Sequence, residues 1–345
     1  MSARYPGFGR GRGFSMPVRR LALCLLLLSV LLVLLASSMG STGWDSVLSA
    51  RQDPVVWQIV WDIRLPRAWG AWLAGALLGL AGAVAQGLFR NPLADPYLLG
   101  SASGASLGVG MGLVWLSALP AAGLWWAYIG LTGAAFVGAV GAVLLTLLLA
   151  GGAAQPLRLL LAGVVVGVVV GALGQLIMMM RPEVLLSMQS FLWGSTSFVG
   201  WEACAIMTVA LLVCLLLAVA LSSLLDGLSL GEATATSLGL PLVRARAVLV
   251  MVLALATGAA VAHTGLIGFV GLAAPHLVRS LAPSAYRYFI VLSALMGAVL
   301  LLSADTLARS LIAPQELPVG VLTAVLGGGY LLWLMHRSGQ RRGRL

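Results

Sequence analysis

The sequence predicts an all-α polytopic membrane protein with about ten transmembrane helices. Its mean hydropathy is +1.05 and only 9% of its 345 residues are charged, whereas a soluble domain carries about 25%. Apolar stretches of roughly 20 residues, each long enough to cross about 30 Å of hydrocarbon, recur along the chain. They are Leu21–Met39, Trp69–Leu88, Leu98–Leu116, Leu124–Ala150, Leu159–Met180, Cys204–Leu225, Ala247–Val261, Gly265–Leu281, Phe289–Leu307 and Val319–Met335.

The first stretch follows Arg19 and Arg20 and ends in small residues, as a cleaved signal peptide does. Its apolar run is longer than the roughly 7–15 residues of a signal peptide, so we expect a retained helix. The two stretches around His263 are short for spans.

All twenty basic residues are arginine, and their distribution predicts the topology. Five precede Leu21 and four follow Met335, so the positive-inside rule puts both termini in the cytoplasm. Ten spans place fifteen arginines inside and five outside, at Arg51, Arg64, Arg67, Arg181 and Arg309. We therefore expect a basic cytoplasmic N-terminus at 1–20, one transmembrane domain at 21–336 and a basic cytoplasmic tail at 337–345. The net charge of +10 reflects topology rather than nucleic-acid binding.

The chain lacks the residues that ATP hydrolysis or metal chemistry would need. A P-loop needs a lysine that reaches the nucleotide phosphates, and the sequence has none. Its histidines, His263, His276 and His336, are scattered without a carboxylate cluster. We expect no catalytic residue, no metal site and no cofactor on this chain, with ATP and Mg²⁺ bound by a partner ATPase.

Asp305 is the carboxylate placed deepest in an apolar stretch, and it has two interpretations. Ion-driven transporters need titratable groups near the bilayer midplane. Arg309 lies four residues on, one helical turn away, and would pair with Asp305. The ion pair is the preferred interpretation, and a proton relay is the alternative.

The segment Ser229–Gly239 reads as a short helix that is capped at both ends. Ser229 and Glu232 fit an S-x-x-E capping box. Gly239 supplies a left-handed stop, and Pro241 prevents the helix from resuming. So short a helix is marginal alone, so we expect it to rest against another protein on the cytoplasmic side.

The fifth stretch carries glycines at helical spacing, Gly163, Gly167, Gly171 and Gly174, followed by Gln175, Met178 and Arg181. Close helix packing explains such stripes. A smooth wall leading to thioethers and a guanidinium would also suit a passage for a bulky anion. Arg181 has a second alternative, which is to extend toward the outer interface.

Two further motifs suggest special geometry. Gly265, Gly268, Gly271 and Pro275 should break any helix, and broken backbone at membrane depth is tolerated only where protein or water covers it. Arg64 and Arg67 flank Leu65-Pro66 on the outer side. They are either interfacial anchors or a docking point for an acidic protein.

Five linked motifs resemble the permease subunits of binding-protein-dependent ABC importers for iron-siderophores, haem and cobalamin. They are RLPR (Arg64–Arg67) with the following Ala74–Gly108, LSLGEATATSLGLP (Leu228–Pro241), GLIGFVGLAAPHLVR (Gly265–Arg279), ADTLAR (Ala304–Arg309) and ELPVGVLTAVLGG (Glu316–Gly328). The resemblance implies the type II ABC importer permease architecture, in a bacterial inner membrane. It implies a homodimer in the lipid bilayer, two cytosolic ABC ATPase subunits and a periplasmic substrate-binding protein.

The resemblance also implies roles for matching residues. Docking of the binding protein falls to Arg64, Arg67 and Arg309. Coupling to the ATPase falls to helices at 226–241, through Ser229, Leu230, Gly231, Glu232, Thr236, Leu238 and Gly239. The pathway residues are Gly167, Gly171, Gln175, Met178 and Arg181. Motif positions with a structural role are Asn91, Pro92, Asp95, Pro96, Gly268, Gly271, Pro275 and His276.

The expected function is inward transport of a metal chelate. Arg181 favours an anionic chelate such as haem or a ferric siderophore, and cobalamin is the alternative within the family. An ion-coupled secondary transporter with Asp305 as its titrating group is the competing class. A membrane scaffold without transport is a third, which the glycine-lined fifth stretch disfavours.

Overall fold

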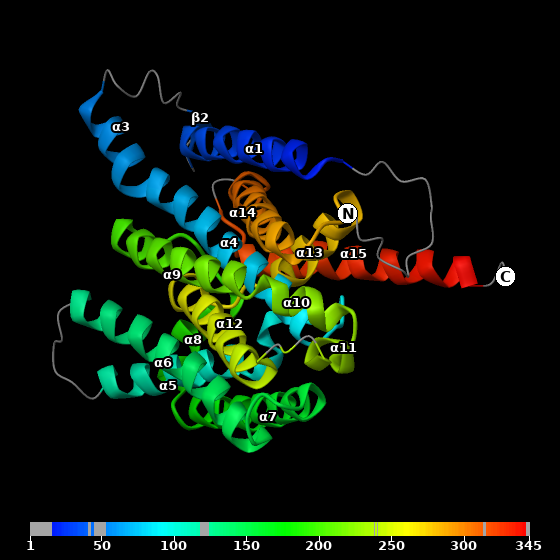
Figure 1. The fold of residues 1–345 in the computed structure, drawn as a ribbon. Helices are drawn as coiled ribbons and strands as arrows, with labels where there is room; N and C mark the ends of the chain where they lie inside the picture. The colour runs from blue at the N-terminus through cyan, green and yellow to red at the C-terminus, as the bar shows by residue number, and fades with distance from the viewer. Residues whose placement is uncertain are drawn as a thin grey trace.

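The protein is almost entirely helical, as a computed structural model shows for residues 16–40, 43–44, 53–117, 124–237, 239, 241–312 and 315–342. The strands found in these residues form one two-residue ladder, β1 (Met39–Gly40) with β2 (Gly43–Trp44). Long helices lie side by side in a bundle, and the short helices α10 (Ser222–Ser229) and α11 (Glu232–Ser237) lie at one end of it (Figure 1). We refer to this end as the α11 end and to the opposite end as the α3 end, after α3 (Pro54–Ile59).

Within the described residues, seven helical segments are long and apolar enough to cross a membrane. They are α1 (Val18–Ser38), the continuous helix Pro54–Leu88, α6 (Leu124–Ala150), α7 (Pro156–Met180), α9 (Trp201–Ala220), α12 (Leu242–Thr264) and α14 (Tyr286–Ser310). The predicted count of ten spans is not confirmed.

Three predicted spans have shorter helical or apolar segments. They are α5 (Ser101–Ser117), α13 (Val270–Leu281) and α15 (Val319–Arg342), whose apolar part is Val319–Trp333. The twelve residues of α13 rise only about 18 Å, less than the hydrocarbon thickness. The continuous helix Pro54–Leu88 consists of α3, η1 (Val60–Arg64) and the long α4 (Leu65–Leu88). Short elements complete the order: η2 (Pro96–Leu99), η3 (Pro182–Val184) and α8 (Leu185–Trp193).

Helix α4 lies at the centre and packs against α9, α12, α13 and α14. Its glycines make this possible, because a Cβ at Gly75 would overlap the backbone of Gly297 on α14, and one at Gly79 would overlap Ser293. Small residues thus let the two helix backbones approach closely.

The predicted break around Gly268 is found, but it is shorter than expected. Residues 265–269 are irregular, with left-handed backbone at Gly265 and Phe269. The expectation that Gly271 and Pro275 also break the helix is wrong, because both lie inside α13. Proline removes the helical hydrogen bond to the carbonyl four residues earlier, which is that of Gly271. That carbonyl lies against Gly82 of α4, where a Cβ would overlap it, so tight packing accommodates the irregularity.

Candidate functional site

Four charged side chains meet toward the α3 end and form what we term the charged network: Arg67, Asp305, Arg309 and Glu316. Arg67 Nη1 lies 3.0 and 2.9 Å from the two carboxylate oxygens of Glu316. Its Nη2 lies 3.4 Å from Asp305 Oδ1. Arg309 Nη2 lies 2.8 Å from Asp305 Oδ2, so the ion pair inferred from the four-residue spacing is present.

The loop between α8 and α9 joins this network through two hydroxyls. Thr196 donates a hydrogen bond to Asp305 Oδ1. Ser197 Oγ donates to Glu316 Oε2 at 3.3 Å. The network therefore connects α4, the end of α14, the segment before α15 and the α8–α9 loop.

Exposure differs sharply among the members of the network. The side chains of Asp305 and Arg309 are 1% and 8% exposed, and that of Arg67 is 12% exposed. Glu316 is 31% exposed and is the member that solvent reaches best. Arg64, the third predicted docking arginine, is buried at the end of η1, so the three arginines are not a freely exposed patch.

At the α11 end, the prediction that Ser229–Gly239 forms one helix capped at both ends is wrong. Ser229 ends α10, and its hydroxyl donates to the carbonyl of Asp226 rather than capping the next helix. Gly231 has a left-handed backbone (φ +113°) that separates α10 from α11. Glu232 does not reach back to Ser229 because its carboxylate pairs with Arg246 Nη1 at 2.8 Å.

This ion pair attaches α11 to the bundle. Arg246 on α12 is 3% exposed, and its Nη1 also donates to the carbonyl of Ala154 at 2.7 Å. Leu224, Leu225 and Leu228 of α10 are buried beneath. The outward face carries exposed residues, including Ser229, Leu230, Thr236 and Gly239. Gly239 has the predicted left-handed backbone (φ +71°), and Leu238 lies outside the described residues.

The glycine stripe of α7 faces α5. Gly163 and Gly174 are buried, and Gly167 and Gly171 lie half-buried near Gly100 and Ser103. Packing therefore accounts for this stripe, while the exposed side of α7 is mostly aliphatic and carries Gln175 near its end.

The two other predicted pathway residues differ in their surroundings. Met178 is half-buried and packs in an apolar cluster with Met188 and Val184. Arg181 is exposed, and its Nη1 lies 3.3 Å from Glu183 Oε1. The guanidinium that favours an anionic chelate thus already has a carboxylate beside it.

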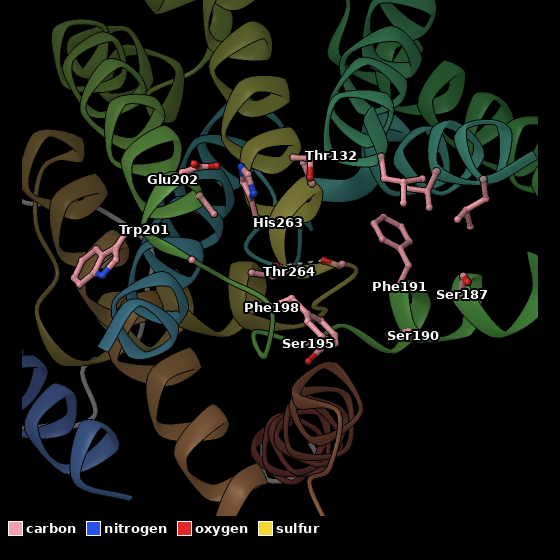
Figure 2. A pocket seen from close by; sticks show the side chains of 17 residues that line it. Thr132, Ser187, Ser190, Phe191, Ser195, Phe198, Trp201, Glu202, His263 and Thr264 are labelled. Atoms are coloured by element: carbon pink, nitrogen blue, oxygen red, sulfur yellow. Dashed lines mark hydrogen bonds between the residues drawn. The ribbon is translucent and has the colours of Figure 1, made fainter. Parts of the chain in front are cut away.

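A cavity of about 710 Å³, which the sequence did not predict, lies among α5, α6, α8, α9 and α12. Figure 2 shows Glu202 and His263 on one side of it and Phe191, Ser187 and Ser190 on the other. Two backbone hydrogen bonds connect the segments that line the cavity after α8 and after α12. Ser195 N–H donates to the carbonyl of Thr264 at 2.8 Å, and Leu266 N–H donates to the carbonyl of Phe191 at 3.0 Å. Because these residues are far apart in the chain, only their tertiary packing brings them to one cavity.

The turn between α4 and α5 holds four of the predicted motif positions. Asn91 Oδ1 accepts from Leu93 N–H at 3.0 Å across Pro92, and Asp95 Oδ1 accepts from Tyr97 N–H at 2.8 Å. Pro96 begins η2 in the position proline prefers. Burial raises the pKa of the Asp95 carboxyl above its ordinary value, and the hydrogen bond from Tyr97 offsets part of that rise.

The remaining motif positions support the packing of α13. A Cβ at Gly271 would come 2.8 Å from Pro96 Cδ, so only glycine fits closely there. His276 makes an edge-on contact with the ring of Tyr330 on α15, with 5.8 Å between ring centroids. Gly268 lies in the irregular segment, where a Cβ would meet open space.

Comparisons with known proteins agree with this architecture. Residues 22–337 match the FecCD transport family. The chain is 39% identical to the hemin transport system permease protein HmuU of Yersinia pestis, covering 92% of this chain and 96% of the relative. It is 40% identical to the vitamin B12 import system permease protein BtuC of Salmonella paratyphi A, covering 91% and 93%. A solved structure described as an inward-facing metal-chelate type ABC transporter superposes with a TM-score of 0.83 at 29% identity, covering 92% and 99%.

Proposed function

The chain belongs to the FecCD transport family, and on that premise we propose that it is the membrane-spanning subunit of an ATP-driven importer that carries a metal chelate into the cytoplasm. The observation that carries the proposal is the match over residues 22–337, which covers α3 to α14 completely and most of α1 and α15. The functional form is a homodimer in a bacterial inner membrane, with two cytosolic ABC ATPases and a periplasmic binding protein.

The two ends of the bundle have separate tasks in this proposal. The α11 end faces the cytoplasm, in agreement with the excess of arginine assigned to that side. There α10 and α11 receive motion from the ATPase, and the Glu232–Arg246 pair passes it to α12. The α3 end faces the periplasm, where Arg64, Arg67 and Arg309 serve the docking of the binding protein.

The alternative of an ion-coupled transporter loses support from the charged network. A proton relay needs a carboxylate that exchanges protons along a pathway. Asp305 is instead buried between Arg67 and Arg309 and accepts a hydrogen bond from Thr196. These contacts fit a structural carboxylate that holds two guanidiniums together.

The proposed substrate is a metal chelate, which is haem, a ferric siderophore or cobalamin. The identities of 39% to a hemin permease and 40% to a vitamin B12 permease are equal in practice. The Arg181–Glu183 pair reduces the local positive charge on which a preference for anions would depend. Uptake measurements with each substrate therefore have to distinguish among the three.

The test is uptake by the permease reconstituted in liposomes with its ATPase and binding protein. We expect ATP-dependent accumulation of one of three substrates offered in parallel: haemin, a ferric hydroxamate or cyanocobalamin. Liposomes with an ATPase variant that cannot hydrolyse ATP serve as the control. Uptake by the permease alone, driven by a proton gradient, would contradict the proposal.

A further inference from the structure

We propose that Glu316 is an internal stand-in for the carboxylate that a docking binding protein presents to Arg67. This inference rests on the proposed function, because it specifies how the docking surface is occupied before the partner arrives. The partner is accordingly a protein with an acidic side chain at its contact surface, which must take the place of Glu316.

The contact between Arg67 and Glu316 has the chemistry of a docking contact. Both carboxylate oxygens lie within 3.0 Å of Arg67 Nη1, an arrangement that an incoming glutamate or aspartate would reproduce. Glu316 occupies Arg67 Nη1 with both of its oxygens. A carboxylate of the binding protein can take this position on Nη1 only after Glu316 has moved away. Docking at Arg67 is therefore an exchange of one carboxylate for another.

Exposure restricts this exchange to Glu316. The other carboxylate on Arg67 belongs to Asp305, which is 1% exposed and also bound by Arg309 and Thr196. Glu316 is 31% exposed, and besides Arg67 it accepts a hydrogen bond from the hydroxyl of Ser197. A partner thus meets one replaceable carboxylate and one fixed carboxylate at the same guanidinium.

Displacement of Glu316 also changes the α8–α9 loop. Ser197 loses its acceptor when Glu316 moves, and Ser197 is adjacent to Thr196, which stays on Asp305. The same loop is joined by backbone hydrogen bonds to the end of α12 at Thr264 and to the start of α15 at Gly320. Docking at Arg67 is in this way connected to α8, α12 and α15 through hydrogen bonds that are all present in the described part of the chain.

The first experiment compares Glu316→Gln with Glu202→Gln in the complete permease–ATPase complex in lipid nanodiscs. Glu202 lies in the first turn of α9, next to the same loop. It is exposed and lies outside the charged network, so its variant matches the change in net charge. The probe is the substrate-binding protein that stimulates ATP hydrolysis by the wild-type complex. We expect Glu316→Gln to tighten its binding about fivefold, the upper value of a partly exposed ion pair, and Glu202→Gln to change it less than about twofold.

The second experiment measures hydrogen exchange of the backbone amides at residues 195–199 in the permease without its partner. We expect faster exchange in Glu316→Gln, by about threefold, and wild-type exchange in Glu202→Gln. Equal tightening by both variants, weaker binding of Glu316→Gln, or unchanged exchange would each overturn the stand-in role. If the wild-type complex binds no binding protein although exchange responds as expected, the proposed docking function fails, and the stand-in role fails with it.

Discussion

Asp305 and Arg309 lie one turn apart on α14 and form an ion pair with 2.8 Å between Oδ2 and Nη2, at the buried centre of the charged network. Arg67 approaches the same carboxylate from α4, with Nη2 3.4 Å from Oδ1. One carboxylate therefore compensates part of the charge of two guanidiniums that come from different helices.

The Asp305→Asn variant should be markedly destabilised. It leaves Arg309, with a side chain 8% exposed, without its ionic partner. Removal of one partner from a buried ion pair costs about 3–5 kcal/mol, because the remaining charge is uncompensated. The measurement is the thermal unfolding midpoint of the purified permease in detergent.

A double variant separates this structural role from proton relay. Asp305→Asn combined with Arg309→Gln removes both charges, so it should recover part of the lost stability, as a double-mutant cycle would report. ATP-dependent uptake should then survive in the folded fraction. A double variant that folds normally and yet shows no uptake would contradict a purely structural role for Asp305.

Gly82→Ala should disrupt the contact between α4 and α13. A Cβ at this position would overlap the carbonyl oxygen of Gly271, which is backbone and cannot rotate away. Overpacking costs typically about 1–3 kcal/mol, and a clash between two helix backbones lies at the upper end. The unfolding midpoint should fall, whereas Gly133→Ala on α6 should leave it unchanged because nothing lies within 4 Å of its added Cβ.

The sequence predicted the features that depend on local spacing and composition. The four-residue interval between Asp305 and Arg309 places the two side chains on one helix face, and the structure confirms the pair. The glycine stripe of the fifth stretch likewise indicated close packing, and Gly163 lies against the backbone of Leu98 and Leu99. The left-handed backbone at Gly239 followed from glycine alone.

Features that depend on distant partners could not be predicted. Ser229 and Glu232 match the pattern of a capping box, yet Glu232 forms an ion pair with Arg246, a buried arginine of the next helix. The left-handed backbone at Gly231 also separates Ser229 from the helix that it was predicted to cap. Glu316 belongs to the motif ELPVG, but no local pattern reveals that Arg67, on α4, is its partner. Pairs this far apart in sequence are set by helix packing alone.

The stability of the α4–α5 turn should depend on pH through Asp95. Burial raises its pKa in the folded protein above the unfolded value of about 3.9. The protonated Asp95 carboxyl therefore adds to the free energy of unfolding. This addition is complete below the unfolded pKa and is lost as the pH rises through the folded pKa. Asp95→Asn keeps an oxygen for Tyr97 N–H and cannot ionise. The unfolding midpoint of the variant should rise relative to wild type as the pH increases above about 4, and parallel curves would contradict this assignment.

Coupling to the ATPase should depend on the backbone at Gly239. This residue has φ +71° between α11 and α12, and a Cβ there would meet nothing within 4 Å. Gly239→Val therefore adds no clash but forces a β-branched residue into a left-handed conformation, at a cost of about 1–3 kcal/mol. We expect the spans to remain folded and the stimulation of ATP hydrolysis by the binding protein to fall several-fold. Gly239→Asn is the matched control, because asparagine tolerates this conformation and should retain most of the stimulation. If both variants couple like the wild type, the turn after α11 does not transmit motion from the ATPase.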